Sequence, residues 1–445
     1  MSILAINGGK NLRLKPFPKR EFYNKEIIKQ KLNELIDSDN LSGFRGSYGN
    51  HFFGGEYVRE LEEWFENYFF EKTGTETKVL AVNSCTSALQ IACGAIGLQP
   101  WDEVIVTPWS MTCSATAPMV YGAIPVFADV EKDNFCIDPE SIEKQITEKT
   151  KAIIAVDLFG NPYNVEKINE IAKEYNLYVI EDAAQALGAR YELQLAGTLG
   201  DIGCFSFTQG KHFSCGEGGF IVTENPDLYM KCALIRNHAE AVINSMPIIP
   251  KVKYSNMKNQ FGFNMRMTEM QALVLLEQFK HYRINENTID YFVSLNNIDI
   301  EVQKRIDNVN WFKENIKIDG ITWAESRVNC QHSYYVLPFL FDEEKIGISR
   351  NKFIEAVKAE LTITKTEMGV TQKIDALIWE KYITPIYDMP IFSNYYRDKD
   401  FKNVKELQEK SFCMTSYHSL SLTEEDRNDI KNAFHKVYNN RKELK

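Results

Sequence analysis

The sequence predicts an α/β fold in which a mostly parallel seven-stranded sheet is covered by helices and followed by a smaller C-terminal α+β domain. Short apolar runs alternate with helix-length segments from Lys78 to Asn225. Most runs are rich in Val, Ile, Phe and Ala without polar alternation, as is typical of strands buried on both faces. After Gly262 this rhythm changes. We therefore expect a large domain with an N-terminal arm over residues 1–285 and a small domain over 286–445.

The individual elements follow from apolar spacing and from turn residues. Strands are predicted at Lys78–Asn83, Glu103–Pro108, Pro125–Val130, Ala152–Leu158, Leu177–Asp182, Ile202–Phe207 and Gly219–Thr223. Helices between them are predicted at Thr86–Gly97, Thr112–Gly122, Pro139–Ile146 and Val165–Tyr175. Beyond the sheet we expect a helix at Thr268–Tyr282 with Thr268 as N-cap, a strand at Ser333–Phe341, and helices at Arg350–Leu361 and Glu424–Tyr438.

Composition narrows the classes of partner. A net charge of −10 argues against nucleic acid or an anionic membrane as the main partner. No apolar run approaches the roughly 18 residues of a membrane span, and Ile3–Ile6 is too short for a signal peptide. The nine cysteines are scattered without a CxxC pair, so we expect no metal site and no disulfide framework. Reduced thiols predict a cytoplasmic protein.

The first candidate site element is a strand that turns directly into a helix, at Asn83–Leu89. Parallel sheets bind ligands beyond the carboxyl ends of their strands. The N–H groups of Cys85, Thr86 and Ser87 would begin the helix, where unpaired donors and the helix dipole favour an anion such as phosphate. The alternative is that Ser84 or Thr86 only caps the helix.

The second element is Asp182, which follows Val179, Ile180 and Glu181 at the end of a predicted strand. A carboxylate there is costly to bury unless it has a cationic partner. A protonated pyridine nitrogen would be such a partner. A metal ligand or a helix-capping acid are the alternatives.

The third element is Lys211, on a glycine-flanked turn five residues after Ser206. A nucleophilic lysine needs a lowered pKa and a fixed position, which a cationic ring and a dry pocket supply. The alternative is an exposed loop lysine. Thr86, Asp182, Ser206 and Lys211 all come at or just after the carboxyl end of a strand, and together they predict an enzyme that uses pyridoxal 5'-phosphate (PLP). The chain has no GxxxxGK[ST] run, which a P-loop enzyme requires.

With these residues in this order, the chain resembles the DegT/DnrJ/StrS aminotransferases. Members of this family make amino sugars and aminocyclitols, and they have the PLP-dependent transferase fold type I. The resemblance runs from about Leu41 to Leu422. Its most specific motifs are VIEDAAQALGA, FSFTQGKHFSCGEGGFIVT, RNHA and FGFNMRMTEMQALVLLEQ. It implies amino transfer from L-glutamate or L-glutamine to a keto sugar, nucleotide-linked or not, or to a cyclitol. The pathway implied is amino-sugar, polysaccharide or secondary-metabolite biosynthesis.

The resemblance also assigns roles to residues. Lys211 would bind PLP as a Schiff base and move the proton during transamination. Asp182 would pair with the pyridinium nitrogen, and Gln185 would lie near the 3-oxygen of the ring. The phosphate would be held by three residues: Cys85, Thr86 and Ser206.

Asn264 matches an asparagine that family members extend to the phosphate of a partner subunit. The resemblance therefore implies a homodimer with shared active sites. Many members also stack an aromatic side chain on the PLP ring, and the equivalent position here is Thr112. Either Trp109 is displaced toward the ring or a smaller residue covers it.

Three histidines are candidates for substrate contact: His212, His238 and His332. Each has a structural alternative. Sugar 3-dehydratases of the same family carry His at the lysine position, but five residues on from Ser206 is Lys211, so a dehydratase or lyase is the less favoured reading. A non-catalytic PLP-fold binding protein is the other alternative, and it would be expected to lack Lys211 or Asp182. The segment Leu361–Trp379 is longer than usual in the family; it either shapes the substrate mouth or is a surface insertion.

Overall fold

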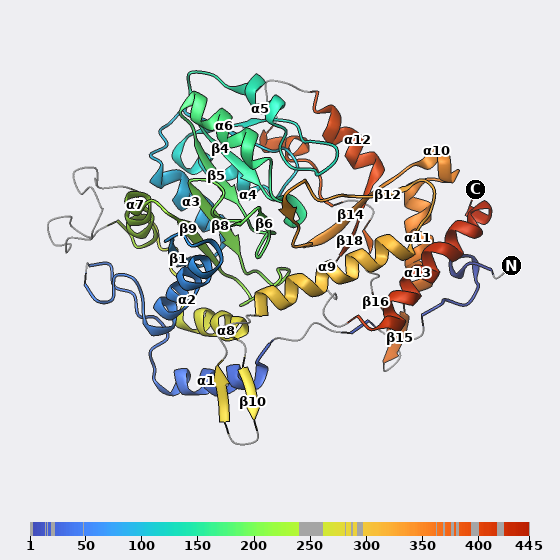
Figure 1. The fold of residues 1–445 in the computed structure, drawn as a ribbon, viewed down its shortest axis with the longest axis horizontal. Coiled ribbons are helices and arrows are strands. Elements are labelled where there is room, and N and C mark those ends of the chain that lie inside the picture. Colours follow the sequence, from blue (N-terminus) through green and yellow to red (C-terminus); the bar gives the residue numbers. More distant parts are fainter. Residues whose placement is uncertain are drawn as a thin grey trace.

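At the centre of the molecule lies a seven-stranded sheet with the order β1-β9-β8-β5-β4-β2-β3 (Figure 1). The computed structural model describes residues 3–13, 15, 17–18, 23–47, 49–239, 261–280, 282–285, 288–291, 297–361, 363–367, 370–374, 378–379, 382–392, 400–415 and 422–444. The strands are β1 (Lys78–Val82), β2 (Glu103–Val106), β3 (Ile124–Phe127), β4 (Thr150–Val156), β5 (Tyr178–Asp182), β8 (Ile202–Ser206) and β9 (Gly219–Thr223).

All seven predicted strands are confirmed, with ends that differ by a few residues. The pairs β2–β3, β2–β4, β4–β5 and β5–β8 are parallel, whereas β9 runs antiparallel to both β8 and β1. The carboxyl ends of the six parallel-running strands therefore meet at one edge of the sheet. Asp182 and Ser206 are the last residues of β5 and β8, at that edge.

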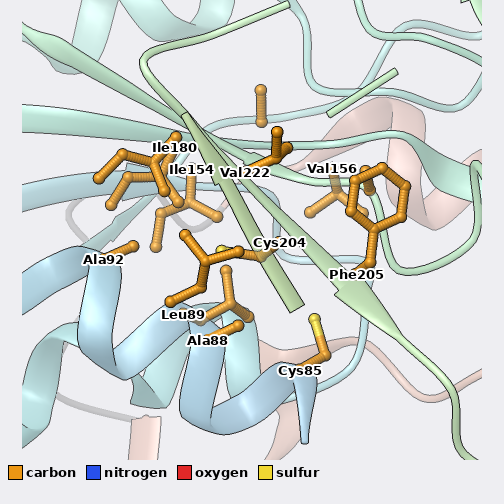
Figure 2. Close-up of a cluster of buried hydrophobic side chains, with 14 of the residues drawn as sticks. Cys85, Ala88, Leu89, Ala92, Ile154, Val156, Ile180, Cys204, Phe205 and Val222 are labelled. Carbon is orange, nitrogen blue, oxygen red and sulfur yellow. The ribbon is translucent and has the colours of Figure 1, made fainter. Parts of the chain in front are cut away.

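Helices cover both faces of this sheet. Figure 2 shows α3 lying on it through Ala88, Leu89 and Ala92, which meet Ile154 and Ile180 of the strands. Small side chains on this helix face let its backbone approach the sheet closely. The helices of this part are α1 (Lys25–Asp37), α2 (Glu56–Thr73), α3 (Cys85–Ala95), α4 (Cys113–Thr116), α5 (Pro139–Gln145), α6 (Val165–Tyr175), α7 (Pro226–Arg236) and α8 (Glu269–Phe279).

Two predicted helices differ from those in the structure. The segment Thr112–Gly122 divides into α4 and a short 3-10 helix, η2 (Pro118–Tyr121), because Pro118 has no N–H to donate. The helix predicted to reach Tyr282 ends at Phe279, since Tyr282 begins β10 (Tyr282–Asn285), which pairs with β11 (Thr288–Tyr291). Thr268 is the N-cap of α8, as predicted.

The C-terminal part is built on a second, smaller sheet with the order β12-β14-β18-β17. Its strands are β12 (Ile321–Trp323), β14 (Val336–Phe341), β17 (Ile378–Trp379) and β18 (Ser411–Thr415). Its helices are α9 (Asn297–Asn315), α10 (Glu343–Ile346), α11 (Arg350–Leu361), α12 (Lys402–Lys410) and α13 (Glu424–Asn439). A separate core fills it, to which Leu4 and Phe17 from the N-terminal segment also belong. The division into two domains at 285/286 stays a prediction.

The predicted strand Ser333–Phe341 begins only at Val336. The backbone N–H groups of Ser333 and Tyr335 donate instead to the carbonyls of Gly160 and Phe159, in the short 3-10 helix η3 (Leu158–Gly160) after β4. The C-terminal part is thereby hydrogen-bonded to the edge of the large sheet where the parallel strands end.

Smaller elements complete the described fold. A three-stranded sheet joins β13 (Cys330–Gln331), β6 (Arg190–Tyr191) and β7 (Gln194–Leu195). The segment Leu361–Trp379 contains the hairpin of β15 (Ile363–Glu367) and β16 (Val370–Ile374), which forms a sheet of its own, drawn near α13 in Figure 1. The remaining 3-10 helices are η1 (Ala5–Asn7), η6 (Ile386–Asp388), η7 (Pro390–Phe392) and η8 (Arg441–Leu444).

Candidate active site

Asp182 is a buried carboxylate held from three directions. Its side chain is almost fully buried, and Ser114 Oγ donates to its Oδ2 at 2.7 Å. The N–H of Ala184 donates to Oδ1 at 3.2 Å, and the Cys85 thiol lies 3.9 Å from the same oxygen. Burial raises the pKa of Asp182, while the Ser114 hydroxyl and the charge of Lys211 act in the opposite direction. A cationic partner would therefore stabilise the ionised form of this acid.

Lys211 lies on the turn after β8, where its N–H donates to the carbonyl of Thr208 at 2.9 Å. Its side chain is half-buried, and Nζ lies 4.4 Å from the centre of the Tyr335 ring. Burial raises the pKa of Asp182 and that of Cys113, and in both groups the positive charge of Lys211 acts against this rise. The acid and the lysine that the sequence singled out are thus neighbours in the fold, although 29 positions separate them in the chain.

The start of α3 lies at the same edge. Ser84 is the N-cap, and its side chain accepts the N–H of Ser87 at 3.1 Å. The N–H groups of Cys85 and Thr86, at the first two positions of the helix, have no acceptor within the helix. Gly219, paired with Ser206 across β8 and β9, packs against this start: a Cβ there would lie 2.7 Å from the nitrogen of Cys85. A glycine is therefore required for β9 to pass so close to the helix.

The three residues predicted to hold phosphate differ in what they expose. Thr86 is exposed and Ser206 is half-buried at the end of β8. Cys85 is buried, and burial raises its thiol pKa well above the usual value. Since this neutral thiol faces Asp182, the group that Cys85 can offer to an anion is its backbone N–H.

Gln185, three residues after Asp182, is fixed at both ends of its carboxamide. Its Oε1 accepts the N–H of Phe159 at 2.8 Å, and its Nε2 donates to the hydroxyl of Tyr382 at 2.7 Å. The side chain is almost fully buried. Tyr382 belongs to the C-terminal part of the chain and was not singled out from the sequence.

Trp109 lies in the core. It is fully buried, its ring meets Phe159 edge-on with centroids 6.1 Å apart, and its Nε1 donates to the carbonyl of Ile383 at 3.3 Å. Thr112 is half-buried directly before α4. Between the two alternatives for the ring-covering position, this geometry favours the smaller residue.

The three candidate histidines occupy different environments. His212 and His332 are buried; His212 Nε2 lies 3.1 Å from the carbonyl of Ser333, and His332 Nδ1 accepts the N–H of Tyr334 at 2.8 Å. Burial lowers the pKa of His332 to about 3. His238 is exposed and has a positive φ of 65°. These contacts favour a packing role for His212 and His332, and substrate contact stays a prediction.

Asn264 is exposed on a segment that joins α7 to α8. Its Oδ1 accepts from Arg266 Nε at 2.8 Å, and its backbone forms a bridge with Asn237. Phe261, three residues earlier, is 82% exposed. An amide and a large aromatic ring thus face outward from the same segment.

Two acids near the site are structural. Glu181, beside Asp182 on β5, accepts the N–H groups of Gly197 and Leu199 and so anchors the loop before β8. Asp157, after β4, accepts the N–H of Tyr163 at 3.0 Å. Glu181 and Asp182 are adjacent in the sequence, and the pleat of the strand separates their side chains, because neighbouring residues point to opposite faces.

Taken together, these groups fit PLP. A buried carboxylate whose described partners are a hydroxyl, a thiol and a backbone N–H suits a protonated ring nitrogen, and the start of α3 suits a phosphate. Lys211 provides the amine that this cofactor requires. The described residues contain no group of three His, Cys, Asp or Glu side chains placed to hold a metal.

Comparison with known proteins identifies the family. A model of the DegT/DnrJ/EryC1/StrS aminotransferase family matches residues 45–290. The chain belongs to this family. It is an aminotransferase, and aminotransferases of this family depend on PLP.

Several DegT-family relatives cover most of the chain. GDP-perosamine synthase from Escherichia coli O157:H7 is 33% identical over 394 residues, which span 88% of this chain and 91% of that protein. A putative L-glutamine:3-amino-2,3-dideoxy-scyllo-inosose aminotransferase from Micromonospora echinospora is 30% identical over 360 residues, which span 80% of this chain and 77% of that protein. The resemblance to this family seen in the sequence is confirmed.

Solved structures of DegT-family proteins share the fold. DesI in the presence of its TDP-sugar product matches with a TM-score of 0.76 at 22% identity, over 99% of this chain and 97% of that one. An aminotransferase from Psychrobacter cryohalolentis matches with a TM-score of 0.73 at 25% identity, over 96% and 99%. These matches confirm the predicted α/β fold of PLP-dependent transferases. In the described residues, no helix has the length and apolar character needed to cross a bilayer.

Proposed function

We propose that this aminotransferase binds PLP through Lys211 and transfers an amino group from L-glutamate or L-glutamine to a keto sugar, nucleotide-linked or not, or to a cyclitol. The observation that carries the proposal is the proximity of the buried Asp182 to Lys211, whose positive charge acts on this acid, at the edge where α3 begins. The names of the relatives support this substrate class, because GDP-perosamine, a scyllo-inosose and a TDP-sugar are each a sugar or a cyclitol.

Bound PLP would supply an electron sink for the carbon that carries the amino group. Asp182 would hold the proton on the ring nitrogen, since a buried carboxylate is most stable beside a cation. Lys211 would bind the cofactor. Once its amine is released, it would move a proton between the substrate carbon that carries the amino group and the cofactor.

The remaining cofactor contacts would come from the surrounding elements. The N–H groups of Cys85 and Thr86, with the hydroxyls of Thr86 and Ser206, would hold the phosphate. Gln185 would face the 3-oxygen of the ring, and Thr112 would cover one ring face. Of the three histidines, the exposed His238 is the best placed to meet a substrate.

We further propose a homodimer in which Asn264 serves the active site of the partner subunit. The exposed amide and the exposed Phe261 on the same segment support this, because a large apolar side chain in water favours burial against another surface. A cytoplasmic location is proposed as well. The cysteines for which pairing is described (85, 93, 113, 136, 204, 215, 232 and 330) are free thiols, as suits a reducing compartment.

The visible absorbance of the purified protein with PLP tests the function. We expect an absorbance band that borohydride abolishes in the wild type and that Lys211→Ala lacks, while the control Lys231→Ala on α7 retains it. A borohydride-sensitive band that persists in Lys211→Ala would contradict the proposal. Addition of L-glutamate or L-glutamine should then convert the cofactor to its amine form. A deoxygenated product without net amine transfer to the acceptor would favour the dehydratase alternative instead.

A further inference from the structure

Gln185, Phe159 and Tyr382 form a triangle of mutual contacts at the edge of the active site. Together they join three segments that are distant in the sequence. Gln185 follows β5, Phe159 lies in the turn after β4, and Tyr382 comes from the C-terminal part. The carboxamide of Gln185 bonds both of the other residues, and the rings of Phe159 and Tyr382 meet edge-on with centroids 4.8 Å apart. Each residue of the triangle therefore contacts the other two.

The backbone of Phe159 determines which way the carboxamide points. A backbone N–H can only donate, so the atom of Gln185 that it meets must be Oε1. The atom that faces the Tyr382 hydroxyl is then Nε2, and the hydroxyl oxygen accepts from it. Of the two hydrogens on Nε2, one is used by Tyr382. The second is the one that Gln185 can direct to a ligand.

Phe159 itself is held in an uncommon conformation. Its φ is +63°, a region that residues with a side chain seldom adopt. Such conformations persist only where the surroundings fix them, and they gather at ligand-binding sites. Here the surroundings are the Gln185 carboxamide on the N–H of Phe159 and the N–H of Tyr335 on its carbonyl.

The segment that carries Tyr382 is bound to the same edge. The carbonyl of the next residue, Ile383, accepts from Trp109 Nε1 at 3.3 Å and from Gln408 Nε2 at 2.7 Å. The N–H of Ile386 donates to the carbonyl of Pro108 at 2.8 Å. Tyr382 is therefore presented by a segment whose backbone is pinned to the loop after β2.

We propose that Tyr382 is a positioning residue, which orients the Gln185 carboxamide so that its second N–H serves the 3-oxygen of the PLP ring. The inference rests on the proposed function, since it needs PLP in the site. It adds that the C-terminal part of the chain contributes to cofactor binding through this phenol. A disturbance of the segment at 382–386 would thereby reach the cofactor.

The test is a double-mutant cycle read out as PLP affinity. Tyr382→Phe removes the hydroxyl and keeps the ring on Phe159, and Gln185→Leu removes the carboxamide. Loss of one hydrogen bond predicts PLP binding weaker by about 2- to 12-fold in Tyr382→Phe. In the Gln185→Leu background the same substitution should have no further effect. The control is Tyr387→Phe, whose ring stacks on Phe401 at 4.9 Å in the same segment, and it should bind PLP as the wild type does.

A second readout is the pH at which the absorbance of the bound cofactor changes. This pH midpoint should shift in Tyr382→Phe and Gln185→Leu and stay unchanged in Tyr387→Phe. A change in packing alone would not shift the midpoint. Thermal unfolding of each PLP-free variant checks that it folds. Wild-type affinity in Tyr382→Phe, or an equal effect in both backgrounds, would overturn the role of Tyr382 while leaving the proposed function intact. Absence of PLP binding in the wild type would overturn both.

Discussion

Ser114 Oγ donates a hydrogen bond of 2.7 Å to Oδ2 of Asp182, and both side chains are buried. Ser114 belongs to α4, which follows β2, whereas Asp182 ends β5. A hydroxyl has one hydrogen to give. When it is given to Oδ2, the carboxylate is stabilised in its ionised form and keeps lone pairs for a second donor. The serine thus prepares the acid for a cationic ligand.

Ser114→Ala should therefore weaken PLP binding and activity. The lost bond is charge-assisted, so about 1.5–3 kcal/mol, or roughly a 10- to 150-fold fall in kcat/KM, is expected. The pKa of Asp182 should rise, since the Ser114 hydroxyl opposes the effect of burial. The matched control is Ser110→Ala, a buried serine in the loop that leads into α4. If both variants lose the same activity, the effect belongs to the loop and not to the bond.

Shared active sites make a distinct prediction for mixed dimers. Chains with Lys211→Ala and chains with Asn264→Ala, each impaired alone, should regain activity when coexpressed. A hybrid dimer would contain one doubly damaged site and one intact site, so random mixing predicts about one quarter of wild-type activity. The measurement is the aminotransferase activity of the coexpressed mixture relative to that of the wild type. No recovery would show that Asn264 acts within its own chain or not at all.

Asp157 should make stability depend on pH. It is fully buried, and burial together with the neighbouring Glu181 carboxylate raises its pKa well above the usual value. The side chain of Asp157 is also hydrogen-bonded to that of Glu181, so the two carboxyl groups share a proton. The native state therefore holds a proton that the unfolded chain releases near pH 3.9. The contribution of protonated Asp157 to the free energy of unfolding is therefore fully present below that pH. It is lost as the pH rises through the raised pKa that Asp157 has in the folded state.

Asp157→Asn removes this titration while retaining Oδ1 as the acceptor for the N–H of Tyr163. We expect the urea midpoint of the wild type to fall relative to that of the variant as pH rises above about 4. Unfolding curves at a series of pH values check this, with exposed Asp133→Asn as control. Parallel curves for wild type and Asp157→Asn would contradict the assignment.

His332 should act on stability with the opposite sign. Burial lowers its pKa to about 3, so the ring is neutral in the folded protein but takes up a proton near pH 6.5 when unfolded. Its contribution is thus present at neutral pH and is lost as pH falls from about 6.5 toward 3. His332→Asn should reduce the fall in Tm between pH 7 and pH 5. It should also change the KM for the keto acceptor by less than about 3-fold, since the ring is buried and bonded to the backbone of Tyr334. A large rise in KM with unchanged stability would instead support contact with the substrate.

The sequence was sufficient for the large sheet because its strands are buried on both faces. Apolar runs such as Ile202–Phe207 cannot occupy any other environment at low cost. Their ends were less certain, since hydrogen-bond partners decide where a strand begins. Ser333 and Tyr335 lie directly before an apolar run and were included in the predicted strand, yet their N–H groups bond to the turn after β4, and the strand starts at Val336.

What the sequence determined by itself was the family, the fold and the order of Asp182, Ser206 and Lys211 along the edge of the sheet. Strand ends of a parallel sheet meet in space, so residues that follow them can be grouped without coordinates. Only the tertiary structure decided that Ser114 supports Asp182, that Tyr382 meets Gln185, and that Trp109 lies in the core. These contacts join segments whose separation in the chain carries no periodic signal. Their geometry is set by how the C-terminal part and the loop after β2 pack on the finished sheet.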